Sequence, residues 1–160
     1  MNKTAVRDLI LAQLRADLDL QTRAALLARD EAISEESRPE NQYDMHSQEA
    51  AYLAEGQARH ALEISETLAL YEGLPLTALL SDAPAAVGSL VEVAGARGAP
   101  VWYFLGPRGG GIEVLVGAHT VLVLTPQSPL GRELMGKPAG APVRLPGRAA
   151  GGPHRIVSVR

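Results

Sequence analysis

The sequence predicts an α+β protein in which a long antiparallel helical hairpin precedes a small β-rich domain. Two observations lead to this prediction. Residues 4–33 contain neither proline nor glycine and repeat apolar residues at helical spacing, whereas residues after 87 form short apolar runs separated by glycine and proline. With 160 residues, 46% of them hydrophobic, the chain can bury a core in one or two small domains.

The first helix is expected from Thr4 to Ile33 and carries a seven-residue apolar repeat. The side chains of this repeat, the seam of the helix, become smaller toward its end, from leucine to alanine, which would let another helix approach closely. Gln21 interrupts the repeat. The members of the seam are Leu11, Leu14, Leu18, Ala25, Ala28 and Ala32.

The second helix is expected from about Asn41 to Tyr71, with Gly56 as its weak point. A short connection makes the two helices antiparallel, and about 30 residues at 1.5 Å each give a coiled-coil hairpin roughly 45 Å long. The alternative is an ordinary two-helix layer packed on the second domain. The expected seam consists of Ala51, Ala54, Ala58, Ala61, Ser65 and Leu68.

The connection between the helices, residues 34–41, is the acidic tip of the predicted hairpin domain, residues 1–75. Ser37 and Glu40 fit a capping box, in which the serine accepts from a helical N–H and the glutamate reaches back to the cap. Pro39 is tolerated in a first helical turn. Glu35 and Glu36 add negative charge beside the cap.

The charges of the two halves differ in sign. Residues 1–75 carry 14 acidic and 7 basic residues, whereas residues 76–160 carry 4 and 8. An acidic arm repels phosphate, which argues against direct duplex binding by the first half. The chain has no cysteine, so disulfides and thiolate metal sites are excluded. The first residues lack a long apolar run, which predicts a cytoplasmic protein without a membrane segment.

After a linker at residues 76–86, the segment 87–160 reads as a domain of short strands. Their connections are too short for crossover helices, so antiparallel pairing is expected. The glycine-rich stretch from Pro107 to Gly111 lacks the following helix of a phosphate-binding loop and is expected to be a hairpin turn. The expected strands are Leu90–Val93, Val101–Leu105, Ile112–Val116, Thr120–Leu124, Pro142–Leu145 and Arg155–Val159.

The segment from Ser128 to Lys137 predicts a brief capped helix. Ser128 is a favoured N-cap, and Pro129 suits the first helical position. Leu130 and Leu134 share a face, and Gly136 can end the turn in left-handed geometry. The plainer interpretation of this segment is a loop that covers a sheet edge.

The same segment, Ser-Pro-Leu-Gly-Arg-Glu-Leu-Met-Gly-Lys, resembles the signature of the Gre transcript-cleavage factors. In that family the signature lies in an FKBP-like C-terminal domain and is followed by two strands, as expected here. Upstream, Glu40-Asn41, Glu49 and Glu55-Gly56 resemble landmarks of the family's hairpin. The resemblance covers both predicted domains.

The resemblance implies a bacterial transcription elongation factor that binds RNA polymerase at its secondary channel. The hairpin tip would act near the RNA 3′ end and help the polymerase hold a second Mg²⁺, so the factor is not itself an enzyme and holds no tight cofactor. Contact with DNA would be indirect and without sequence specificity. The residues implied in docking are Ser128, Pro129, Leu130, Arg132, Leu134 and Lys137, with Arg108 as a further basic candidate.

The tip departs from the family pattern at one position. Glu40-Asn41 align with the family motif, and this puts Ser37 where a cleavage-competent factor has Asp. Serine can cap a helix but brings no charge to a cation. Glu40, with Glu36, is therefore expected to be the metal-proximal carboxylate, while Ser37 and Asn41 shape the tip. A factor that occupies the channel without stimulating cleavage is the close alternative.

Two other classes compete with a polymerase-binding factor. An FKBP-like peptide-binding module would use Trp102, Tyr103 and Phe104 to line an apolar pocket, but alternation along one strand would send them to opposite faces. A helical-hairpin adaptor or chaperone-like protein would explain the arm. It would not explain the segment from Ser128 to Lys137.

Overall fold

The computed structural model describes residues 1–33, 46–76, 83–95, 99–144 and 154–160. The predicted acidic tip, including Glu36, Ser37, Glu40 and Asn41, lies outside these residues. The described chain divides into two compact units. We call Met1–Leu11 with Leu70–Arg160 the sheet unit, and Ala12–Ala69 the helical unit. The predicted boundaries at residues 75 and 86 remain predictions.

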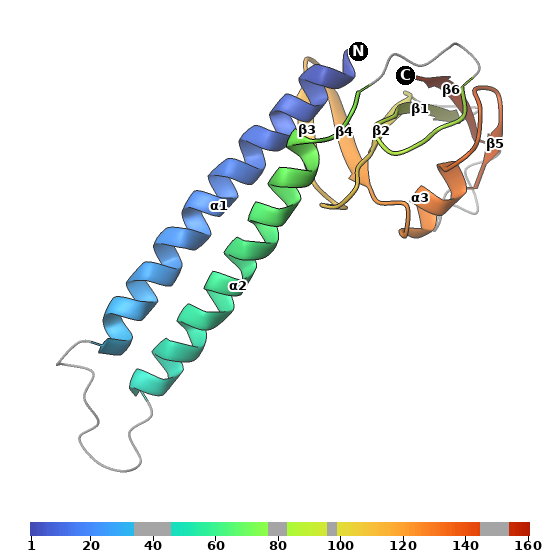
Figure 1. Cartoon of the computed structure of the whole chain (residues 1–160). Coiled ribbons are helices and arrows are strands. Elements are labelled where there is room, and N and C mark those ends of the chain that lie inside the picture. The colour runs from blue at the N-terminus through green and yellow to red at the C-terminus, as the bar shows by residue number, and fades with distance from the viewer. Residues whose placement is uncertain (34–45, 77–82, 96–98, 145–153) are drawn as a thin grey trace. The chain divides into compact units, whose positions relative to one another are not determined.

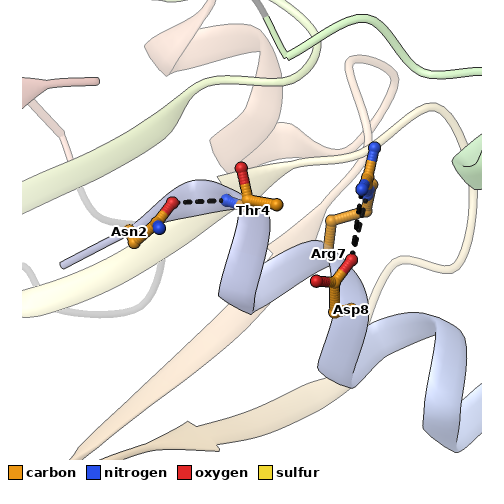
Figure 2. Close-up of polar contacts among 4 residues, drawn as sticks. All are labelled: Asn2, Thr4, Arg7 and Asp8. Atoms are coloured by element: carbon orange, nitrogen blue, oxygen red, sulfur yellow. Dashed lines mark hydrogen bonds and ion pairs between the residues drawn. The ribbon is translucent and has the colours of Figure 1, made fainter.

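The two long helices are α1, Lys3–Ile33, and α2, His46–Glu72. Asn2 begins α1 as a cap, because its side-chain oxygen accepts from the Thr4 N–H at 2.9 Å (Figure 2). Arg7 and Asp8 pair on the next turn, with Nη2 and Oδ1 3.2 Å apart. Within the helical unit the two helices run alongside each other in opposite directions (Figure 1).

The buried face of α1 matches its predicted seam. Leu11, Leu14 and Ala28 are buried, and the other predicted members are half-buried. The seam predicted for α2 is wrong by one residue at half of its positions. Ala51, Ala58 and Ser65 are exposed, whereas their preceding residues are buried or half-buried, namely Ala50, Gln57 and Ile64. The prediction placed Ala58 in the seam in preference to Gln57. The structure instead buries the line of residues along α2 that contains the bulky, apolar Ile64.

Six strands form one mixed sheet in the order β3-β4-β2-β1-β6-β5 (Figure 1). The strands are β1, Leu90–Gly95; β2, Val101–Leu105; β3, Glu113–Val116; β4, His119–Leu124; β5, Pro142–Val143; and β6, His154–Val159. Each lies at a predicted site, with small differences at the ends. Leu145, predicted to end β5, is outside the described residues.

The expectation of a wholly antiparallel sheet is wrong at one pair. Strands β2 and β4 are parallel, with Trp102 opposite Val121 and Leu105 opposite Leu124. The reason is the position of β3. After β2 the chain first forms β3 at the sheet edge and then turns back as β4, which lies between β3 and β2 and therefore runs parallel to β2. A strand with its loops supplies the crossover that was expected to need a helix. Pro107–Gly111 is thus not a hairpin turn, because β2 and β3 are not neighbours.

Apolar residues cover both faces of the sheet. On one face Tyr103 and Leu105 belong to a buried cluster with Leu134 of the short helix α3, Pro129–Leu134. On the other, Trp102 and Phe104 alternate with them, and Phe104 stacks on Tyr71 with ring centroids 6.3 Å apart. The three aromatic residues are thus core residues on two faces. Their burial agrees with the core packing that the alternation predicted, and not with the alternative of a lined peptide pocket.

Candidate functional site

The described part of the candidate site is α3, Pro129–Leu134, with the residues that flank it. Ser128 is its N-cap, as predicted. The Ser128 hydroxyl accepts from the Gly131 N–H at 3.0 Å and donates to the Thr125 carbonyl at 2.8 Å. Pro129 occupies the first turn, where no N–H is needed. Both bonds of the serine therefore serve the turn itself.

Gly131 is a requirement that the sequence pattern did not reveal. A Cβ at this residue would lie 1.9 Å from the Thr125 carbonyl oxygen and 2.7 Å from Ser128 Oγ. No side chain fits at the first distance without movement of the backbone. The glycine lets α3 lie directly against the residue that follows β4. The need for glycine at residue 131 thus comes from contact with Thr125, which the sequence pattern of α3 does not reveal.

The end of α3 is held by backbone hydrogen bonds to the chain before β1. Gly136, with φ of +75°, donates its N–H to the Ala85 carbonyl at 2.8 Å, and Ala85 donates to the Lys137 carbonyl at 2.9 Å. The predicted left-handed ending is therefore confirmed. Leu134 is fully buried in the cluster, and Leu130 packs against it. These contacts hold the segment on the sheet.

Lys137 is engaged within the segment. Its ammonium group donates to Glu133 Oε1 at 2.6 Å and to the Pro142 carbonyl at 2.9 Å. Glu133 Oε1 also accepts from the Arg144 N–H at 3.2 Å. The hydrogen bond from Lys137, followed by that from Arg144, lowers the pKa of Glu133 below its usual value. Glu133, which the pattern did not single out, joins α3 to the segment that holds β5.

The six predicted docking residues thus fall into two groups. Ser128, Leu130, Leu134 and Lys137 make the internal contacts just described. Pro129 and Arg132 are exposed on α3, and Arg108 is exposed between β2 and β3. Docking by any of them remains a prediction. The tip residues, including the predicted metal-proximal Glu40 and Glu36, cannot be placed beside them, because they lie outside the described residues.

Among the residues that the structure describes, no three acidic or histidine side chains gather as a metal site. The described helices also include none that is long and apolar enough to cross a membrane.

The chain matches no protein-family model and no curated protein sequence. Among solved structures it is similar to GreA factor homolog 1 (Gfh1) of Thermus thermophilus, with 15% identity and a TM-score of 0.38 over 94% of each chain. Gfh1 of Thermus aquaticus gives 16% identity and a TM-score of 0.38, over 93% of this chain and 90% of that one.

Proposed function

We propose that the protein is a Gre-type accessory factor that binds bacterial RNA polymerase at the secondary channel. The observation that carries the proposal is the segment from Ser128 to Lys137. It has the residues of the Gre signature, and it folds as a capped turn that leaves Pro129 and Arg132 on the surface. The long paired helices before the sheet supply the arm that such a factor needs.

In this proposal the two groups of α3 residues have different tasks. Ser128, Leu134 and Lys137 hold the segment in shape, while Pro129 and Arg132 contact the polymerase. An exposed guanidinium favours an acidic or hydrogen-bonding surface on the partner. The proposed factor performs no chemistry alone. It delivers the carboxylates of Glu40 and Glu36 to a Mg²⁺ that the polymerase mainly holds.

The docking part of the proposal is tested with purified RNA polymerase from the source organism. Arg132→Ala should weaken binding about tenfold, the equivalent of roughly 1.4 kcal/mol, because one charged contact at an interface is lost. Arg29→Ala is the matched control, since it removes the same charge from an exposed position on α1. Wild-type affinity in Arg132→Ala would contradict docking through this residue.

The tip is tested by transcript cleavage in stalled elongation complexes. Glu40→Ala and Glu36→Ala should reduce cleavage if they approach the metal, while Asp30→Ala, an exposed carboxylate on α1, should not. Unchanged cleavage in both tip variants would exclude a catalytic role for the tip.

Ser37 favours a second candidate function in the same class, occupation of the channel without cleavage. Serine provides no carboxylate where the family pattern has Asp. In the same assay Ser37→Asp should raise cleavage above that of the wild type. If cleavage is absent from the wild type and binding is intact, the channel-occupying function is the correct one.

A further inference from the structure

A second line of apolar residues follows α1 on a different side from its buried seam. Ala16, Leu20, Ala24 and Leu27 succeed one another at steps of three or four residues, so they share one face of the helix. We call these four residues the outer stripe. Leu20 is 63% exposed and Leu27 is 70% exposed. The solvent face of a helix is ordinarily polar, so large exposed leucines in one line indicate a surface that a partner covers.

An ion pair lies along one edge of the outer stripe. Arg23 Nε donates to Asp19 Oδ1 at 3.1 Å, and both side chains are exposed. The helix around the stripe is nearly neutral, since residues 13–31 carry three basic and four acidic residues. By contrast, residues 46–72 of α2 carry one arginine and five glutamates. Two copies of α1 can therefore approach each other with little net repulsion.

The outer stripe is complementary to itself in size. If two copies of α1 lie antiparallel about a two-fold axis near Gln21, Leu20 of one copy lies opposite Ala24 of the second copy. Leu27 then lies opposite Ala16. Each large side chain meets a small one, as close packing of two helix surfaces requires. A parallel pair in register would instead place leucine against leucine and alanine against alanine.

The same alignment also matches the charges. Asp19 of each copy lies opposite Arg23 of the second copy, so the two ion pairs form a ring of four charges with alternating sign. Size and charge thus select one geometry independently. A patch that is complementary to itself about a two-fold axis is the property of an interface between identical chains.

We propose that the protein forms a two-fold symmetric dimer through the outer stripe, with the two copies of α1 antiparallel. The overlap from residue 13 to residue 31 is about 28 Å long at 1.5 Å per residue. So short a contact makes a transient dimer, with a Kd of about 10–100 µM. The proposal depends on exposed residues of the helical unit and not on the proposed polymerase binding.

Sedimentation equilibrium of the full chain, at roughly 1–500 µM, tests the dimer. Leu20→Glu/Leu27→Glu should raise the Kd at least about tenfold, because a charge would be buried against alanine. Leu26→Glu/Ile33→Glu is the matched control and should keep the Kd of the wild type. It makes the same change at two exposed apolar positions, also seven residues apart, on another side of α1. A monomeric wild type, or an equal effect of both double variants, overturns the proposal.

A charge exchange tests whether the partner is a second copy in this alignment. Asp19→Arg alone and Arg23→Asp alone should each raise the Kd at least about tenfold, because four like charges would then meet at the axis. An equimolar mixture of the two variants should dimerise at least as tightly as the wild type, since each copy then meets opposite charges. A mixture that remains monomeric contradicts the alignment.

Cysteine cross-linking tests the orientation, because the chain has no cysteine of its own. Ala12 and Asp30 are exposed and lie opposite each other across the proposed axis. A mixture of Ala12→Cys and Asp30→Cys should therefore form mixed cross-links with a short thiol reagent, and each variant alone should form few. The reverse result, cross-links within each variant and none between them, would mean a parallel pair and would overturn the proposed dimer.

Discussion

Gly131 and Gly56 show how differently two glycines act in helices of this chain. A Cβ at Gly131 would meet the Thr125 carbonyl at 1.9 Å, whereas at Gly56, inside α2, it would meet nothing within 4 Å. The first glycine allows close packing of α3. The second only adds backbone freedom to the unfolded chain.

Gly131→Ala should therefore destabilise the protein by about 1–3 kcal/mol, because the backbone of α3 must move away from β4. Gly56→Ala is the matched control and should stabilise by about 0.5–1 kcal/mol through helix propensity. Urea unfolding midpoints of the two variants measure both effects. A Gly131 variant as stable as the wild type would show that α3 can shift freely.

Glu133 gives the same segment a dependence on pH. Its pKa is lowered by the hydrogen bonds from Lys137 and Arg144, so it binds a proton less readily in the folded state than in the unfolded state. Its stabilising contribution is complete above the unfolded-state pKa and is lost as the pH falls through the lowered folded-state value. The side chains of Glu133 and Lys137 are each 31% exposed, so the contribution of their ion pair to stability stays near that of a surface pair.

Glu133→Gln should accordingly cost about 0.5 kcal/mol at neutral pH and almost nothing in strong acid. Unfolding curves at several pH values, measured for this variant and the wild type, check the difference. Glu63→Gln on α2 serves as a control, since Glu63 pairs only with His60 at an exposed site among the described contacts. A constant difference between Glu133→Gln and wild type at all pH values would contradict the ionic origin of the effect.

Among the elements, the end of α2 is joined to the loop after β2. The Tyr71 hydroxyl donates to the Arg108 carbonyl at 2.8 Å, and its ring stacks on Phe104. A Cβ at Gly106 would lie 2.0 Å from this hydroxyl, so the loop approaches the tyrosine closely. Burial raises the pKa of Tyr71, which keeps the hydroxyl protonated as a donor.

Tyr71→Phe should cost about 1 kcal/mol, because it leaves the Arg108 carbonyl without this donor while keeping the ring stack. Thermal unfolding monitored by circular dichroism measures the loss. Tyr52→Phe is the control, because Tyr52 is 71% exposed on the same helix. A loss as large for Tyr52→Phe would mean that the measured effect is not due to the loop contact.

For the whole molecule, the division into units cuts across both long helices. The first residues of α1 belong to the sheet unit, where Val6 and Ile10 are fully buried. Later on the same helix, Leu20 in the helical unit is 63% exposed. A helix that looks uniform in sequence thus serves two cores.

Ile10→Ala should destabilise the sheet unit by about 2–5 kcal/mol, because it leaves a cavity in a closed core. Trp102, the single tryptophan, is buried in that unit and reports its unfolding by fluorescence. Leu20→Ala should leave this transition unchanged. If Ile10→Ala shifts helix unfolding without shifting the tryptophan signal, the assignment of residues 1–11 to the sheet unit is wrong.

By itself the sequence determined the two long helices, the sites of the six strands and the capped turn at Ser128, because these follow from local spacing, caps and turn residues. The tertiary structure decided the seam row of α2, the parallel pairing of β2 with β4, the need for glycine at residue 131, and the internal use of Lys137. Each of these depends on a neighbour distant in the chain. The local sequence pattern predicts which face of a helix or strand can be buried. The element that packs against this face decides which row of residues is buried and which contacts form.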